Sequence, residues 1–176
     1  MQKSATKVSE LLNLRISSVD QLAIACARFH DCPFDLAAQS FDSEQHTWTG
    51  DFVRASSDPT RIVRTRRALL LKVTEFPLIA SRIVIHNVVE AEIQDRAQIG
   101  TYTFRQVHRT DSGCCFEFHQ DCDIYIDVSG PFVAELRDVG ELADVRGRIT
   151  SVGFMDFGIQ LAPSTEPLEP HGVVDE

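Results

Sequence analysis

Long hydrophobic runs are missing from this sequence. Its apolar stretches, such as ALLL at residues 68–71, are far shorter than the ~20 residues that a membrane-spanning helix needs. The first 14 residues, MQKSATKVSELLNL, lack the apolar block of a secretory signal peptide. We therefore expect a cytoplasmic protein with no membrane partner.

Paired cysteines and common enzyme motifs are missing as well. The five cysteines are odd in number and form no CxxC pair, so we expect free thiols in the cytosol rather than disulfides. The sequence contains no GxSxG, P-loop, GxGxxG or HExxH motif. We therefore expect no cofactor, and we favour a non-enzymatic role over an enzymatic one.

Basic residues are scarce in the second half of the chain, where most of the acidic residues lie. The net charge of the 176 residues is −9. An acidic surface repels the phosphate backbone of nucleic acids, so nucleic acid is a disfavoured partner. Such a surface suits a basic protein partner instead.

The N-terminal 40 residues predict two helices. An apolar stripe at residues 8–12 indicates the first. The second follows Ser18, a good N-cap that forms a capping box with Gln21, and Pro33 ends it because a proline ring cannot continue the helical hydrogen bonds. A further helical turn is expected at residues 35–39. The apolar positions of the second helix are Val19, Leu22, Cys26 and Phe29.

From residue 46 onward apolar residues recur at every second position, which is the period of a half-buried β-strand. Turn sequences separate the strands, and they are too short for the crossover that parallel strands require. We therefore expect antiparallel neighbours. The expected strands cover residues 46–54, 61–74, 81–94, 99–109, 114–128, 131–138, 145–152 and 156–162.

One domain accounts for a chain of this length. We place it at residues 1–162, with a helical segment at 1–40 and antiparallel strands at 46–162. Residues 163–176 contain three prolines and no periodic apolar positions, so we expect a mobile acidic tail there.

The stretch CCFEFHQDC at residues 114–122 gathers three cysteines and a histidine, which are side chains that ligate metals. Read as one strand, residues 114–128 place apolar side chains at every even position except Gln120. Cys115 and His119 are then ~13 Å apart, too far for one ion with ligand bonds of ~2.0–2.3 Å. We therefore expect a half-buried strand that bends near Gln120, and no metal site.

Five side chains are candidates for a ligand pocket between the sheet and the helices. His30 and Cys32 follow the second helix and would form a thiol–imidazole pair, or supply the distant ligand that a metal at the cysteine stretch would need. The single tryptophan would form a pocket floor, and the last two candidates share one strand face. The candidate ligand-binding residues are His30, Cys32, Trp48, Glu117 and His119.

The segment RIVRTRRALLLK at residues 61–72 is the one basic cluster of the chain. Arg64 and Arg66 share a face of the expected strand and form a candidate anion-binding pair. Internal pairing with acidic residues of the second half, such as Glu90 and Glu92, is the interpretation that we favour for this cluster.

The segment DVRGRITSVGFMDFGIQLA at residues 144–162 predicts a β-hairpin. Its order of a glycine, a short apolar strand, Asp-Phe-Gly and a second strand is similar to part of the S1-type oligonucleotide-binding barrel. The resemblance covers about 20 of the 176 residues. It implies single-strand nucleic-acid binding, with Phe154 and Phe157 stacking on bases and Arg146 and Arg148 contacting phosphates.

These patterns predict an α+β protein. Its large curved antiparallel sheet would be an open barrel or a sandwich-like meander, consecutive from residue 81 to 138, with the two helices packed on it. The expected core comprises Leu22, Cys26, Ile83, Ile85, Val89, Ile93, Phe116, Phe118, Ile124, Ile126, Phe132 and Leu136.

The expected function is non-enzymatic binding through protein–protein contacts, for example at an outer apolar patch around Val84 and Val88. The first alternative is a small-ligand-binding protein or enzyme with a pocket between sheet and helices. The second is a single-strand nucleic-acid binder that uses the C-terminal hairpin.

Overall fold

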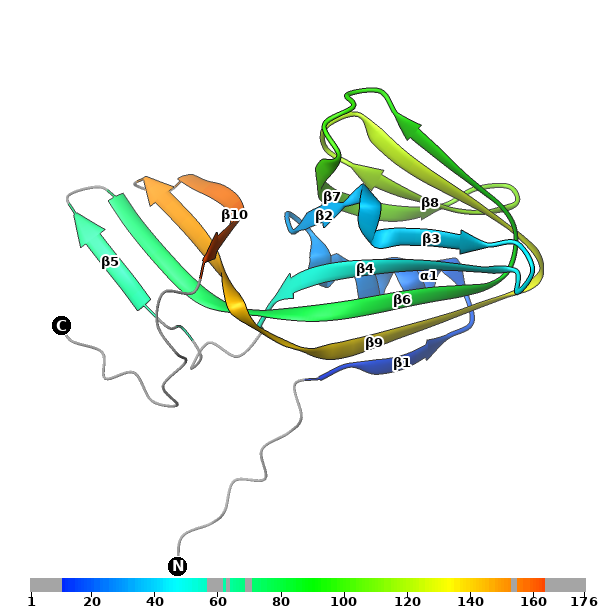
Figure 1. Ribbon diagram of the computed structural model, residues 1–176, viewed down its shortest axis with the longest axis horizontal. Helices are drawn as coiled ribbons and strands as arrows, with labels where there is room; N and C mark the ends of the chain where they lie inside the picture. The colour runs from blue at the N-terminus through cyan, green and yellow to red at the C-terminus, as the bar shows by residue number, and fades with distance from the viewer. Residues whose placement is uncertain (1–10, 57–61, 63, 69–70, 153–154, 164–176) are drawn as a thin grey trace, which may run out of the picture.

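The computed structural model describes residues 11–56, 62, 64–68, 71–152 and 155–163. Within these residues the protein is mostly β, with one N-terminal helix on a large antiparallel sheet of ten strands (Figure 1). None of its described helices has the length and apolar character needed to span a membrane. The elements are β1 (Asn13–Ile16), α1 (Val19–Cys26), the 3₁₀ turn η1 (Ala27–Phe29), β2 (Pro33–Asp35), the 3₁₀ turn η2 (Leu36–Ala38), β3 (Gln39–Asp42), β4 (Thr47–Ala55), β5 (Arg64–Ala68), β6 (Leu71–Asp95), β7 (Thr101–Arg109), β8 (Gly113–Phe118), β9 (Cys122–Val152) and β10 (Met155–Pro163).

Helix α1 begins where the sequence predicts. The hydroxyl of Ser18 accepts a hydrogen bond from the backbone N–H of Gln21 at 3.3 Å, and the side chain of Gln21 accepts one from the backbone N–H of Ser17 at 3.0 Å. The expected apolar face is buried, at 5% exposure or less: Val19, Leu22, Cys26 and Phe29.

The N-terminal segment differs from the prediction in two ways. Leu11 and Leu12, the described part of the expected first helix, have no regular structure, and the chain continues as β1 paired with β9. The expected second helix ends at Cys26 and passes into η1 rather than continuing to Pro33. Asp31 takes a left-handed φ of 61°, which a right-handed helix cannot contain. The expected turn at residues 35–39 is present as η2.

The strand order of the sheet is β2-β7-β8-β9-β6-β4-β3, with β1 and β10 added on β9 and β5 on β6. β7, β8 and β9 follow one another as expected, but β6 pairs with β9 instead of β7, so the consecutive meander is wrong at that strand. β6 and β9 are the longest strands, at 25 and 31 residues, and pairing them satisfies more backbone groups than the nine-residue β7 could. The sheet is open and does not close into a barrel.

β6 and β9 bend together, and the bend encloses the core. Asn87 in β6 takes a φ of 61° and Gly130 in β9 a φ of 86°, and the side chain of Asn87 donates to the carbonyl of Pro131 at 3.0 Å. Both strands turn back at this point, so β7 and β8 lie over β4 (Figure 1). α1 and a cluster of aromatic rings fill the space between. Phe34 of β2 lies 4.5 Å from Phe52 of β4, measured between ring centroids.

The bend also changes which side chains are buried. The register of β6 shifts on both sides of Val88, which is fully buried, whereas Val89 is 51% exposed. Val89 was therefore a wrong core prediction, as was Ile93, which is 40% exposed near the end of the strand. Phe132 is only partly buried against the core. The other expected core residues are buried.

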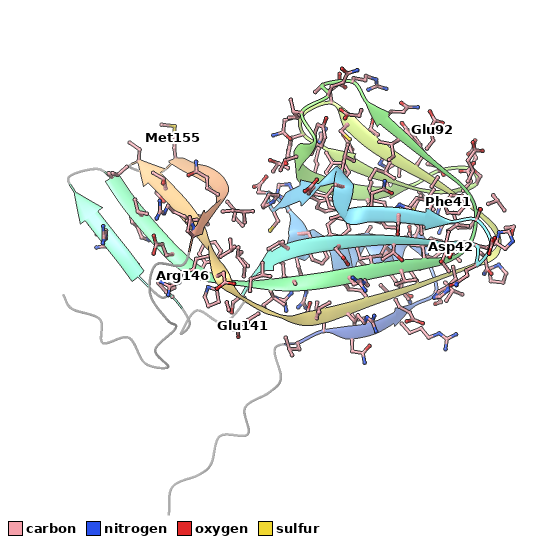
Figure 2. All side chains as sticks on the ribbon, viewed as in Figure 1. Phe41, Asp42, Glu92, Glu141, Arg146 and Met155 are labelled. Atoms are coloured by element: carbon pink, nitrogen blue, oxygen red, sulfur yellow. The ribbon has the colours of Figure 1, made fainter. Side chains whose placement is uncertain are left out.

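A four-stranded section, here called the arm, extends from the body of the sheet. It consists of β5, residues 71–77 of β6, residues 145–152 of β9, and β10. Figure 2 shows Glu141 and Arg146 of β9 where the arm joins the body, and Met155 at the outer part of the arm. The expected strand 61–74 is thus two strands, β5 and the start of β6.

A buried ion pair ties β4, β6 and β9 together. The guanidinium of Arg54 donates to the carboxylate of Asp138 at 2.6 Å, and both side chains are at most 1% exposed. The Asp138 carboxylate also accepts from the hydroxyl of Ser81 and the backbone N–H of Leu12, each at 2.6 Å. Burial by itself raises the pKa of Asp138, but these hydrogen bonds outweigh it and lower that pKa below its usual value.

Candidate functional site

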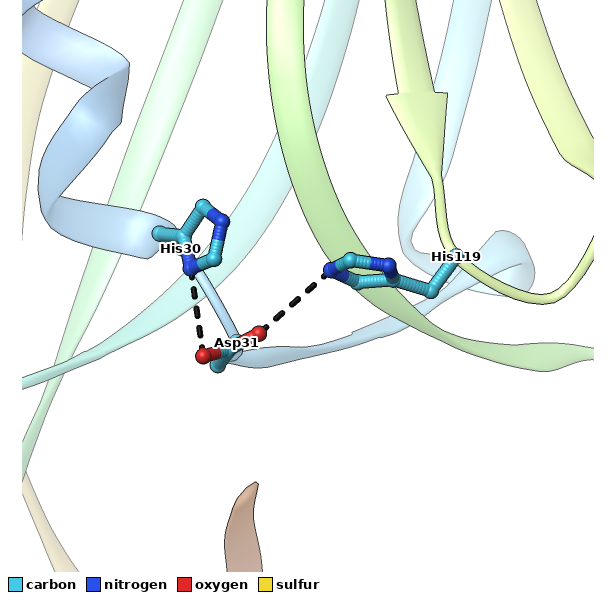
Figure 3. A group of neighbouring side chains, drawn as sticks. All are labelled: His30, Asp31 and His119. Carbon is cyan, nitrogen blue, oxygen red and sulfur yellow. Dashed lines mark ion pairs between the residues drawn. The ribbon is translucent and has the colours of Figure 1, made fainter. Parts of the chain in front are cut away.

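Two histidines and an aspartate meet at the surface beside the end of α1 (Figure 3). Nδ1 of His30 lies 3.2 Å from one carboxylate oxygen of Asp31, and Nε2 of His119 lies 3.4 Å from the other. The two imidazole rings are 5.8 Å apart between centroids and nearly perpendicular. All three side chains are about half exposed, so solvent and solutes reach them.

The end of η1 positions His30 and Asp31. The left-handed φ of 61° at Asp31 turns the chain out of the helix, a conformation that aspartate tolerates better than most residues. The backbone N–H of Asp31 donates to the carbonyl of Phe104 in β7 at 3.0 Å, and the N–H of Phe104 donates to Cys32 at 2.9 Å. The Asp31 backbone is therefore held against β7.

A three-residue turn between β8 and β9 positions His119. Its last residue, Asp121, takes a φ of 59°, as is usual for a hairpin loop of this length. The N–H of His119 donates to the carbonyl of Thr103 at 2.9 Å. The side-chain amide of Gln120 accepts from the N–H of Thr103 at 2.8 Å and donates to its hydroxyl at 3.1 Å.

Neighbouring residues of one strand therefore hold both halves of the cluster. Phe104 binds the segment that carries Asp31, and Thr103 binds the turn that carries His119. Because successive carbonyls along a strand point to opposite sides, β7 can hold one loop at each edge. This arrangement fixes the backbones of the three side chains before any ligand arrives.

The spacing of the ligand atoms suits a metal ion. In a tetrahedral site with ligand bonds of about 2.0–2.1 Å, neighbouring ligand atoms are about 3.3–3.4 Å apart. The distances of 3.2 and 3.4 Å reach the two different oxygens of Asp31, and one ligand atom from each of the three side chains lies within 4.8 Å of the others.

The sequence predicted His30 and His119 as ligand-binding candidates, but it did not predict that the two side chains lie close together. Residues 114–128 form a hairpin, not one long strand, with a turn at the expected break near Gln120. Phe118 pairs directly with Cys122, so the alternation of buried side chains continues across the turn and looks like a single strand. From the sequence, His30 was an alternative distant ligand for a metal at residues 114–122. No residue pattern indicated that His119 would face it across β7.

The other three ligand-pocket candidates lie elsewhere. Trp48 is fully buried, and its indole N–H donates to Gln39 at 2.9 Å. Glu117 is bound by the side chains of Arg105 and Gln106 of β7, at 2.5 and 2.6 Å, rather than by His119. The third, Cys32, follows Asp31 in the chain but is buried, with only 2% of its surface exposed, and is not part of the cluster.

All five cysteines are free, buried thiols with at most 2% exposure. Desolvation by burial raises the pKa of Cys32 and of Cys122 to about 11, and of Cys114 and Cys115 to about 12. It raises the pKa of Cys26 even further. A thiol with a pKa of about 11 is only ~0.1% thiolate at pH 8, so none of these groups is a ready nucleophile.

The folded protein is accordingly expected to be inert to an aromatic disulfide reagent at pH 8. Unfolding in urea exposes the thiols and should release five equivalents of chromophore, compared with fewer than one equivalent from the native protein within minutes. A fast-reacting native thiol would contradict the burial seen here, and mass mapping would identify it.

The arm contains the remaining candidates. The side chain of Arg64 lies outside the described residues, whereas Arg66 is exposed. The expected C-terminal hairpin is present as β9 and β10. Arg146 is 5% exposed and Arg148 donates to Glu75 at 2.7 Å. The two aromatic side chains proposed to stack on bases, those of Phe154 and Phe157, are also outside the described residues.

No protein-family model, curated protein or solved structure matches this chain. The candidate site therefore rests on its own geometry.

Proposed function

We propose that this protein binds one divalent transition-metal ion through His30, Asp31 and His119. The observation that carries the proposal is that one ligand atom from each of the three side chains lies within 4.8 Å of the other two. The backbones that carry these side chains are already held by β7, and two imidazoles with a carboxylate are ligands that zinc takes in proteins.

The donor set favours Zn²⁺ and its neighbours over Mg²⁺ or Ca²⁺. Imidazole nitrogen is a good ligand for zinc, copper, nickel and iron, whereas Mg²⁺ and Ca²⁺ take oxygen ligands in larger number. Three protein ligands also leave at least one position of the ion open. Structural zinc sites usually have four protein ligands, so an open position is typical of an ion that meets another molecule.

Titration of the untagged protein with Zn²⁺ tests this proposal. Calorimetry is expected to show one equivalent bound, and the same experiment with Mg²⁺ should show none. Because only the folded chain assembles the cluster, Zn²⁺ at 100 times its Kd should stabilise the fold by about 2.7 kcal/mol. Absence of Zn²⁺ binding to the wild-type protein would refute the proposal.

Binding through protein–protein contacts, the function expected from the sequence, stays a prediction. The apolar patch expected for it is not where the sequence placed it, because Val88 is fully buried and Val84 partly so. Nucleic-acid binding by the C-terminal hairpin stays a prediction as well.

A further inference from the structure

We infer that the metal site takes a small organic anion, with a carboxylate or phosphate head group, in the groove between α1 and β7. One anion oxygen would fill the open position of the ion, and another would accept from the guanidinium of Arg105. This inference rests on the proposed metal-binding function and names the class of ligand that the site receives.

A groove adjoins the cluster on the side of the helix. Its volume is about 350 Å³, within the range of small-molecule sites. His30 belongs both to the cluster and to the wall of the groove, so this residue links the two. The residues that line the groove are Ala23, Ala27, His30, Arg105, Gln106 and Val107.

The charges around the groove favour a negatively charged ligand. Arg105 donates to Glu117 at 2.5 Å, which uses one of the five N–H donors of its guanidinium, and its side chain is 51% exposed. The side-chain amide of Gln106 holds the other oxygen of Glu117 at 2.6 Å. His108 lies 3.9 Å from this carboxylate, and Asp123, which pairs with Arg96 at 3.8 Å, is also near it.

A divalent ion and Arg105 carry three positive charges, and Asp31 and Glu117 carry two negative charges. One net positive charge therefore remains. A monoanion would neutralise this excess. Glu117 itself is held on β7 by two side chains, so it orients the guanidinium and is not free to enter the groove.

The other walls of the groove favour an organic anion over a bare inorganic one. Ala23 and Ala27 from the helical side and Val107 from β7 are apolar, and Val107 is only 6% exposed. A short hydrocarbon group attached to the anion would lie against these side chains while the head group faces the ion and Arg105.

Titration of the Co²⁺-loaded protein tests the inference, because the visible spectrum of Co²⁺ changes when an anion enters its coordination shell. One equivalent of bound Co²⁺ is established first. Propionate and methyl phosphate are then added separately, and a saturable spectral change is expected for at least one of them. The head group that binds more tightly identifies the kind of anion.

Three variants separate anion binding from structure. Arg105→Gln should weaken the anion about 10- to 100-fold while leaving Co²⁺ affinity within about twofold, since it removes one charge-assisted hydrogen bond. Glu117→Gln breaks the same Arg105 pair but keeps the guanidinium, so anion affinity should hold or rise. Arg109→Gln, which removes an exposed arginine of β7 that pairs with Asp20 instead, should change neither affinity.

The outcomes distinguish the two proposals. If the wild-type protein binds no Co²⁺, both the metal site and this inference are wrong. If Co²⁺ binds but neither anion changes its spectrum, or Arg105→Gln binds anions as the wild type does, only the anion site is wrong. Equal losses in Arg105→Gln and Glu117→Gln would show that the ion pair acts through structure alone, and would also overturn the inference.

Discussion

Replacing Asp138 by asparagine is expected to lower the free energy of unfolding by about 3–5 kcal/mol, the cost of breaking a buried ion pair from one side. The carboxylate is fully buried and accepts hydrogen bonds from Arg54, Ser81 and Leu12. Asparagine keeps the size of the side chain but removes the charge that faces the buried guanidinium. Urea unfolding of the wild-type and variant proteins measures the difference.

The pH dependence of stability should change in the same variant. Hydrogen bonds hold the pKa of Asp138 below the unfolded value of about 3.9, so its contribution is complete above that pH. The contribution is lost as the pH falls through the lower, folded pKa. Asp138→Asn should therefore remove part of the loss of stability that the wild-type protein shows in acid, below about pH 4.

A second ion pair of the same sheet provides the control. Asp51 and Arg82 lie at 2.6 Å, but both side chains are about 40% exposed, so Asp51→Asn should cost less than about 1 kcal/mol. The double replacement Arg54→Met with Asp138→Leu should recover only part of the loss, because no charge then remains buried at the pair but Ser81 and the Leu12 N–H lose their acceptor. Equal effects of Asp138→Asn and Asp51→Asn would contradict the role given to the buried pair.

Replacing His119 or His30 by alanine is expected to weaken Zn²⁺ binding at least about 100-fold. Each change removes one of three ligands, and altering a residue that merely orients a ligand typically costs 10–100-fold. Gln120→Ala should have this smaller effect, since it removes two of the three hydrogen bonds that hold the turn to Thr103 and keeps the imidazole of His119. Competition with a chromogenic chelator measures all three affinities.

His108→Ala is the matched control for the histidine variants. It removes an imidazole of similar exposure, 48% against 41% for His119, from a position outside the cluster. The Zn²⁺ affinity of this variant should remain within about twofold of the wild type. Because the three histidine side chains are exposed, each single histidine variant should change the free energy of unfolding without metal by at most about 0.5 kcal/mol. Equal losses in His108→Ala and His119→Ala would indicate scattered surface binding in place of a site.

Much of the local structure could be predicted because it depends on neighbours in the sequence. Ser18 and Gln21 cap α1, and the spacing of its apolar residues fits the helical period, so the start and buried face of the helix were correct. The alternation expected in the β region follows from the same kind of local pattern, but it was wrong at Cys115, which was expected on the polar face and is fully buried. The same alternation explains why residues 114–128 were predicted as one strand, since a three-residue turn keeps the alternation of a continuous strand.

Strand partners and bends depend on distant parts of the chain and were not predictable in this way. The pairing of β6 with β9 brings together segments that are far apart in the sequence. The left-handed φ of Asn87 shifts the register, so Val88 rather than Val89 enters the core. A count of alternating residues assumes an unbroken pleat, and it fails where a bulge inserts one residue.

By itself, the sequence determined a mostly antiparallel sheet with a capped N-terminal helix, because periodicity and capping are local properties, and the odd cysteine number excluded complete pairing of the thiols. Only the tertiary structure decided that His30, Asp31 and His119 meet. The two segments are brought to one place by hydrogen bonds to Thr103 and Phe104, on a strand that belongs to neither of them. Side chains brought together through a third segment leave no spacing rule in the sequence.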